Sequence, residues 1–180
     1  MLGFALAVCA ALTVPPPTAS AQEAPCPNAG AVAGALPPAA AETAVSCLVN
    51  AVRARAGLRP LAASGRLTVA ARRYAGDMVA RRFFAHVSPT GERLDERIRR
   101  AGYLRSARRW VLGEDIAWGD PRATPAAIVE AWMNSPPHRR VILRRGFREV
   151  GVGVAPGVPV ADPGAGTTVV LDVGRRVMPR

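Results

Sequence analysis

The chain contains no lysine, so all 24 of its basic side chains are arginines, and it has only two histidines, His86 and His138. No H-E-x-x-H pattern is present, which excludes the compact zinc-protease motif. No strong nucleophile stands out either, because Ser88 and Ser135 fit a turn and a helix cap. These absences leave the two imidazoles and the carboxylates as the candidate functional groups.

Acidic side chains are also scarce. The chain has 13 of them against 24 arginines, which gives a formal net charge of +11. A charge of this size favours anionic partners, and we expect cell-envelope polymers or lipids. Aromatic residues make up 5% of the chain and are not interleaved with the arginines, so the stacking surface that nucleic acids require is missing. At 180 residues without internal repeats, we expect one domain and a monomer.

Long hydrophobic runs are absent apart from residues 1–21, which carry no charge. This segment is too short and too interrupted by prolines to span a membrane. It ends in Ala19-Ser20-Ala21, the small-x-small pattern of signal peptidase sites. We therefore predict a signal peptide cleaved near Ala21, a secreted protein, and no transmembrane segment in the mature chain. A lipoprotein anchor at Cys9 is the weaker interpretation, because Val8 is large for the position before the modified cysteine.

Cysteine is rare, and removal of the leader would also remove Cys9. The remaining Cys26 and Cys47 would be an even pair in an oxidising compartment. We predict a disulfide between them. It would tie an Ala/Pro-rich lead-in, residues 22–42, to the first helix of a domain that covers residues 43–177.

Apolar residues recur at three- and four-residue steps, which predicts helices over about 42–56, 64–84 and 93–101, another from Thr124, and a last one from Ser135 through 143. In the tail, residues 150–154 and 169–173 alternate valine or leucine with other residues, which predicts two strands around a Pro/Gly loop over 156–166. Helices first and a hairpin last indicate an α+β fold with helices packed on an antiparallel sheet. Residues 113–119, GEDIAWG, are predicted to form a glycine-bounded turn.

The two histidines lie at helix ends. His138 falls in the first turn of its helix, where the helix dipole disfavours a charged ring, whereas His86 follows a helix C-terminus, where the dipole favours one. Together with Glu114 they would make a three-ligand set suited to Zn²⁺ or another divalent cation, with one position open. The three residues are dispersed along the chain, and a histidine at a helix end is more often a capping residue, so a structural role stays open.

Several short stretches follow one another in a recognisable order: Asn50-Ala-Val-Arg53, Gly57-Leu-Arg-Pro-Leu61, Phe83-Phe-Ala-His-Val-Ser-Pro-Thr-Gly91, Arg97-Ile98, Gly113-Glu-Asp-Ile-Ala117, Ala131-Trp-Met-Asn-Ser-Pro-Pro-His-Arg139 and Glu149-Val-Gly-Val-Gly153. Over about residues 43–175, the chain resembles bacterial members of the CAP superfamily (cysteine-rich secretory, antigen 5, pathogenesis-related), also called SCP-like extracellular domains.

The resemblance implies an α-β-α sandwich with a surface cleft built around a His/Glu cluster, in which His86, Glu114 and His138 match the family's positions. Two residues depart from the pattern. Asp115 stands where the family usually has asparagine, and Ser135 stands where animal and plant members have a second cleft glutamate. Some members bind divalent metal in the cleft and some bind sterols or fatty acids elsewhere, while a general catalytic activity is not established for the family.

Three functions follow as alternatives. The first is a secreted, non-catalytic binding domain whose cleft takes a divalent cation or a small ligand. The second is a metal-assisted hydrolase, in which Zn²⁺ lowers the pKa of a bound water and Glu114 or Asp115 acts as ligand or base. The third is a lipid or sterol carrier. A purely structural role, in which the cluster is a hydrogen-bonded brace, also stays open.

The acidic pair in GEDIAWG carries separate expectations for its two members. Glu114 is expected in the cleft, aimed at the two histidines. Asp115 is expected to point away and to accept hydrogen bonds from backbone N–H groups or arginines. Ile116 and Trp118 are expected to pack this segment against the core.

Overall fold

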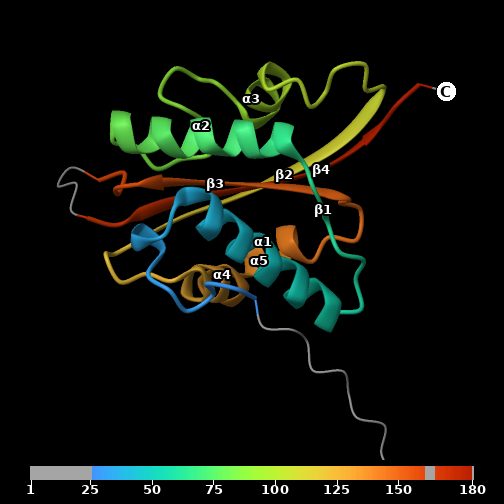
Figure 1. The fold of residues 1–180 in the computed structure, drawn as a ribbon. Coiled ribbons are helices and arrows are strands. Elements are labelled where there is room, and N and C mark those ends of the chain that lie inside the picture. Colours follow the sequence, from blue (N-terminus) through green and yellow to red (C-terminus); the bar gives the residue numbers. More distant parts are fainter. Residues whose placement is uncertain (1–25, 161–164, 180) are drawn as a thin grey trace, which may run out of the picture.

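The computed structural model describes residues 26–160 and 165–179, which form three layers. Figure 1 shows α2 (Gly65–Arg81) and α3 (Leu94–Arg100) on one face of a four-stranded sheet. The other face is covered by α1 (Pro38–Arg55), α4 (Pro125–Asn134) and α5 (Pro136–Ile142). The predicted α-β-α sandwich is therefore confirmed. The predicted leader and its cleavage site lie outside the described residues.

The sheet contains β1 (Ala62–Ala63), β2 (Arg109–Gly119), β3 (Glu149–Pro156) and β4 (Thr167–Val177), in the order β1-β3-β4-β2. The predicted hairpin of β3 and β4 is antiparallel, and β2 pairs antiparallel with β4 along its whole length. The two-residue β1 pairs parallel with β3, so the sheet is mixed rather than purely antiparallel. Strand β2 lies at one edge of the sheet.

Three sequence-based expectations about local structure are wrong. Helix α1 begins at Pro38, inside the predicted lead-in, because a proline is well suited to the first turn of a helix. Residues 113–119 are not a turn but part of the edge strand β2. Ile116 is buried as expected, whereas Trp118, two residues further along on the same face of the strand, is 45% exposed and does not pack on the core.

Two polar side chains of α1 fix the connection to β1. Asn50 both donates to the backbone oxygen and accepts from the backbone N–H of Leu61, at 3.0 and 2.8 Å. Arg53 is fully buried, which is tolerable because its guanidinium donates to backbone carbonyls on every side. The accepting oxygens belong to Arg59, Ile142 and Arg144.

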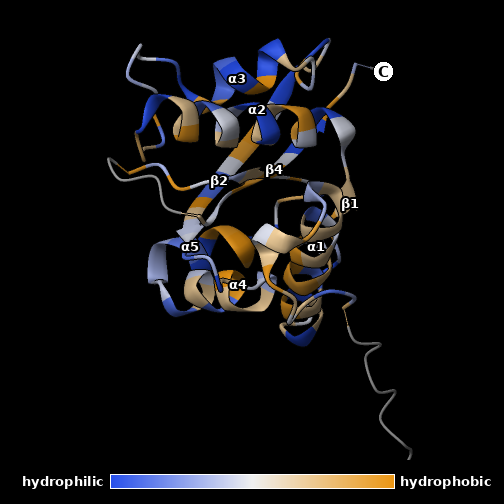
Figure 2. Cartoon of the chain, turned by 60° about the vertical axis from the view of Figure 1, so that its left-hand side comes forward, coloured by the Kyte–Doolittle hydropathy of each residue, from blue (hydrophilic) through white to orange (hydrophobic). Residues whose placement is uncertain are grey.

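Glycines of β3 bring α2 directly onto the sheet. A Cβ atom at Gly151 would overlap the α2 backbone at Leu67 and Thr68, and one at Gly153 would overlap it at Ala71 and Arg72. The valines that alternate with these glycines face the opposite layer, where they join the main core with α1, α4 and α5. The two helical layers differ in hydropathy: Figure 2 shows α4 as largely hydrophobic and the outer α3 as largely hydrophilic.

The predicted disulfide between Cys26 and Cys47 is present, with 5.7 Å between the two Cα atoms. It ties the segment before α1 to the middle of that helix. The same segment is held to the start of α4 by two backbone hydrogen bonds, from Ala33 to Ala123 and from Ala126 to Ala29. Within residues 26–160 and 165–179, no helix has the length and apolar character needed to cross a membrane.

The disulfide closes a loop with a sequence separation of 21 residues, so its removal enlarges the conformational freedom of the unfolded chain. We expect a Cys26→Ser/Cys47→Ser variant to lose about 3 kcal/mol of unfolding free energy in a denaturant titration. Wild-type protein treated with a reductant should lose the same amount. An unchanged midpoint in both experiments would contradict a stabilising role.

Candidate functional site

The site is centred on Glu114, a buried carboxylate on β2. The alternation of the strand places this side chain on the face covered by α2 and α3. One carboxylate oxygen lies 2.8 Å from Nδ1 of His86, and the other accepts a 2.6 Å hydrogen bond from Arg97. The side chains of Glu114 and Arg97 are 2% and 3% exposed, while that of His86 is 56% exposed. A buried ion pair therefore supports an imidazole that faces solvent.

Arg97 also holds the turn that carries His86. Its guanidinium donates to the backbone oxygens of His86 and Glu92, each at 3.2 Å. The same group lies 3.4 Å from the ring centroid of Tyr74, and the Tyr74 hydroxyl donates to the backbone oxygen of Ala85 at 2.6 Å. The position of His86 is thus fixed through its side chain, its own carbonyl and the residue before it.

The sequence interpretation missed Arg97 as a site residue, although a signal was available. Leu94, Ile98 and Ala101 form the apolar stripe of the predicted third helix, and Arg97 falls on that same stripe. A lone arginine among the buried positions of a helix indicates a buried anionic partner, because an unpaired charge there would be costly.

Asp172 is a second residue that the sequence interpretation missed. It lies directly opposite Glu114 in the β2–β4 ladder and is 1% exposed. Burial raises its pKa well above the usual range, and the negative charge of Glu114 raises it further. Asp172 therefore keeps its proton to a higher pH than an ordinary aspartate does. The available signal was a carboxyl group within the otherwise apolar run 169–173.

Asp115 faces the opposite side of the sheet from Glu114, opposite Leu171 of the main core. The expectation that it accepts hydrogen bonds is wrong, because within the described residues neither of its oxygens has a partner and the residue is 1% exposed. Burial raises the pKa of Asp115 to about 8, with a further contribution from Glu114. A protonated carboxyl has one donor and one acceptor, which matches the asparagine expected at this position more closely than a carboxylate would.

The two histidines have opposite pKa directions, as predicted, but the causes differ from the predicted helix dipoles. The hydrogen bond from Glu114 is the main reason that the pKa of His86 is raised above 6.5. Burial lowers the pKa of His138 below 6.5, and the positive charge of His86 lowers it further. Nδ1 of His138 is buried and has no hydrogen-bond partner among the described residues. One imidazole therefore gains a proton more readily than an ordinary histidine, and the other gains one less readily.

The structure brings together two of the three predicted metal ligands. His86 and Glu114 are in direct contact, whereas within residues 26–160 and 165–179 no hydrogen bond joins His138 to either of them. In the same residues, no three histidine, cysteine, aspartate or glutamate side chains are placed to hold one metal ion. Both oxygens of Glu114 are already engaged, so the donors that fit a metal best are the imidazole nitrogens. Metal binding by His86, Glu114 and His138 stays a prediction.

A hollow of about 370 Å³ lies beside His86. Its walls combine apolar and charged side chains, which suits recognition of a small ligand. The lining residues are His86, Val87, Arg93, Leu94, Asp95, Trp110 and Leu112.

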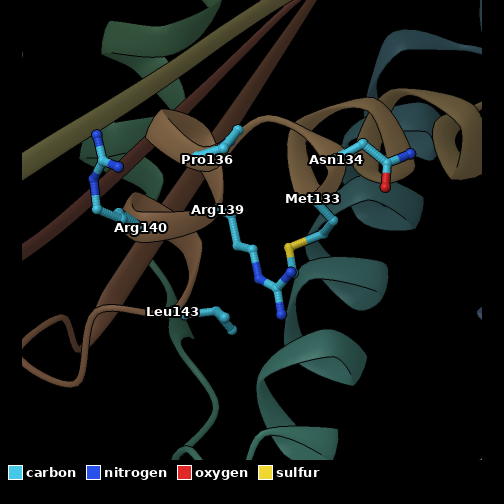
Figure 3. Close-up of a pocket in the computed structure, with 6 residues that line it drawn as sticks. All are labelled: Met133, Asn134, Pro136, Arg139, Arg140 and Leu143. Atoms are coloured by element: carbon cyan, nitrogen blue, oxygen red, sulfur yellow. The ribbon is translucent and has the colours of Figure 1, made fainter.

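A separate hollow of about 470 Å³ lies along α4 and α5, and Figure 3 shows Arg139 beside Met133 among the residues that line it. Asn134, Pro136, Arg140 and Leu143 complete its lining. None of the three predicted ligand residues lines this hollow.

The chain matches a known protein family and one curated relative. The family model described as "CAP: Cysteine-rich secretory protein family" matches residues 48–162. "Uncharacterized protein YkwD" of Bacillus subtilis (strain 168) is 38% identical over 106 residues, which are 59% of this chain and 39% of that protein.

Among solved structures, an extracellular protein containing an SCP domain from Bacillus anthracis str. Ames is similar, with a TM-score of 0.63 and 26% identity. The match covers 77% of this chain and 41% of that one, so the chain spans about two fifths of the length of both Bacillus proteins. An outer surface protein from Borrelia burgdorferi has the same fold, with a TM-score of 0.59, 23% identity, and 74% and 90% coverage of the two chains.

The buried Asp115 makes stability depend on pH. Its pKa is about 8 in the folded state and near 3.8 in the unfolded state, so folded protein binds more protons between these values and stability falls as pH rises through that window. We expect Asp115→Asn to match wild type near pH 4 and to become more stable than wild type by about 5 kcal/mol at pH 8. Denaturant titrations over this range measure the difference. A constant difference between the two proteins would contradict a titrating Asp115.

The hydrogen bond from Glu114 should be visible in the titration of His86. In wild type, histidine NMR signals should give a pKa above 6.5 for His86 and below 6.5 for His138. His86 then stabilises the fold below pH 6.5, and this contribution is lost as pH rises through its folded pKa.

In a Glu114→Gln variant, the pKa of His86 should move toward 6.5 while His138 changes little, because burial is the main cause of the His138 shift. This variant leaves Arg97 without its carboxylate, so we also expect a loss of about 3 kcal/mol of stability. Equal pKa values for both wild-type histidines would refute the electrostatic description even if the variant does not fold.

Proposed function

Because the chain belongs to the CAP family of cysteine-rich secretory proteins, we propose that it is a non-catalytic binding domain of the cell envelope that takes a small polar ligand at His86. Export is supported by the solved relative from Bacillus anthracis, which is described as an extracellular protein. The Cys26–Cys47 disulfide also suits an oxidising compartment.

One observation carries the proposal: an exposed imidazole is held in place by a buried ion pair. A brace between elements could be made by Arg97 and Glu114 alone, since both are buried. His86 adds a side chain that is 56% exposed and stands at the edge of a hollow. Orientation of a solvent-facing group by a buried partner is the arrangement that pre-organises a binding site.

The chemistry of the hollow indicates the class of ligand. Nδ1 of His86 is directed at Glu114, so Nε2 is the nitrogen left for a ligand, and in the charged ring it is an N–H donor. Arg93 adds a second cationic donor, and Trp110 and Leu112 offer apolar surface. This set suits a small molecule that has an oxygen acceptor, such as a carboxylate, phosphate or sugar hydroxyl, next to an apolar or ring-shaped face.

A divalent cation in the same cleft is the second candidate. His86 and His138 could each contribute an imidazole nitrogen, and Glu114 would then orient His86 from behind rather than bind the metal itself. The metal-assisted hydrolase draws on the same residues but also needs a free carboxylate as ligand or base. Glu114 already accepts from His86 and Arg97, and Asp115 is buried on the opposite face of the sheet, so the chain's own groups favour binding over hydrolysis.

Histidine NMR tests the proposal directly, because the chain has only two histidines. The probes are acetate, inorganic phosphate and N-acetylglucosamine, each added to wild-type protein, with Zn²⁺ in a separate titration. We expect at least one oxygen-bearing probe to shift the His86 signals saturably. A His138→Asn variant should keep this response, and a His86→Asn variant should lose binding measured by calorimetry.

The opposite results are equally clear. If acetate, phosphate and N-acetylglucosamine leave His86 unchanged while Zn²⁺ moves both histidines and releases protons, the cation interpretation replaces the proposal. If neither titration moves His86, the cluster is structural and the proposed binding function fails.

A further inference from the structure

The paired ends of β2 and β4 carry a surface that shares only Trp110 with the hollow beside His86. Figure 1 shows these ends side by side, running beyond the helices toward the C-terminal label. Arg109 lies opposite Val177, and the backbone N–H of Arg108 donates to the Val177 oxygen at 2.9 Å. We call this surface the ribbon end and define it by six residues: Arg108, Arg109, Trp110, Arg175, Val177 and Met178.

Large apolar side chains are unusually exposed on the ribbon end. Trp110, Val177 and Met178 are 43%, 44% and 48% exposed. A hollow of about 430 Å³ lies beside Val177 and Met178 and is lined by these two residues together with Arg108 and Arg109. Single exposed apolar residues are ordinary on a protein surface, but a group of them at one projecting edge indicates an interaction site.

The charge on the ribbon end has one sign. Residues 97–113 include six arginines and no acidic residue. Within the described part of the chain, Arg108, Arg109 and Arg175 form no ion pair. Glu149, at the start of the neighbouring strand β3, already contacts Arg176 at 3.6 Å and accepts from the Tyr103 hydroxyl at 2.6 Å. The ribbon end is therefore complementary to an anionic surface.

We propose that the ribbon end binds an anionic lipid bilayer. Arginines can place their apolar stems along the acyl boundary while the guanidinium groups contact lipid phosphates. Tryptophan is favoured at the same depth, between headgroups and acyl chains. The apolar residues lie on both faces of the ribbon, Trp110 on one and Val177 on the other. The ribbon would therefore insert its tip into the membrane interface instead of lying on the membrane with one flat face. A water-soluble polyanion would use the arginines but gain little from the exposed apolar groups.

Vesicle co-sedimentation of the wild-type protein tests this inference independently of the His86 ligand. We expect binding to vesicles of phosphatidylcholine mixed with phosphatidylglycerol and little binding to phosphatidylcholine alone. Salt should weaken the binding, because the Debye length falls from about 10 Å at 0.1 M to about 3 Å at 1 M.

Two matched pairs of variants separate the ribbon end from the protein's general charge. Arg108→Gln/Arg109→Gln should weaken binding about 25-fold, since each arginine near an anionic bilayer contributes about fivefold. Arg139→Gln/Arg140→Gln removes the same charge from α5 and should weaken it far less. Trp110→Ala should reduce binding several-fold, whereas Trp118→Ala should not. Trp118 is the natural control, because it lies on the same face of β2, at the other end, with 45% exposure.

Tryptophan fluorescence adds a readout that does not depend on how well each alanine variant folds. In a Trp118→Phe protein, the emission should shift to the blue when anionic vesicles are added, and in a Trp110→Phe protein it should not. The remaining Trp132 is 1% exposed and should stay constant in both.

Three results would overturn the inference. The first is an absence of binding to anionic vesicles. The second is an equal effect of the two tryptophan variants or of the two arginine pairs. The third is a loss with Arg108→Gln/Arg109→Gln but not with Trp110→Ala, together with equally tight binding of soluble heparin, which would assign the ribbon end to anionic polymers in solution.

Discussion

The buried ion pair between Arg97 and Glu114 is the interaction on which the site and much of the upper layer depend. Removing two charges from water is costly, and the cost is offset only when each charge finds close partners. Arg97 meets this demand with two backbone carbonyls and the ring of Tyr74, and Glu114 meets it with His86. The same contacts join α2, α3, β2 and the turn between the helices. A structural brace and the proposed binding site therefore share the same set of atoms.

Periodicity predicted most of the fold because its signal is strong where one face of an element is purely apolar. The valines of β3 and β4 and the apolar stripe of α2 are such cases, and the Thr124-Pro125 cap located the start of α4. The signal failed at β2. Trp110, Leu112, Glu114, Ile116 and Trp118 alternate correctly, but a carboxylate interrupts the apolar face, and its partner Arg97 comes from a distant helix. No local pattern contains that pairing.

The sequence predicted three residues of the candidate site but not the contacts that link them to the rest of the fold. The resemblance supplied His86, Glu114 and His138, whereas Arg97 and Asp172 appear only once the sheet and α3 are packed together. The adjacent acids Glu114 and Asp115 are separated by the simplest rule of strand geometry, since neighbouring side chains point to opposite faces. Glu114 is paired with Arg97 and His86 on the site's side, whereas the oxygens of Asp115 have no partner among the described residues and lie in the main core. Their adjacency in the sequence therefore says little about a shared role.

Gly151 and Gly153 have no side chains, yet they affect the position of a residue far from them. They let the backbone of α2 lie against β3, and the end of α2 leads into the turn that presents His86. The distance of α2 from the sheet is therefore set by the small size of two glycines and not by a packed side chain. The distance between His86 and Glu114 therefore depends in part on the glycines of β3. A methyl group at either glycine would overlap the α2 backbone and push that helix away from the sheet, which would disturb the contact between His86 and Glu114.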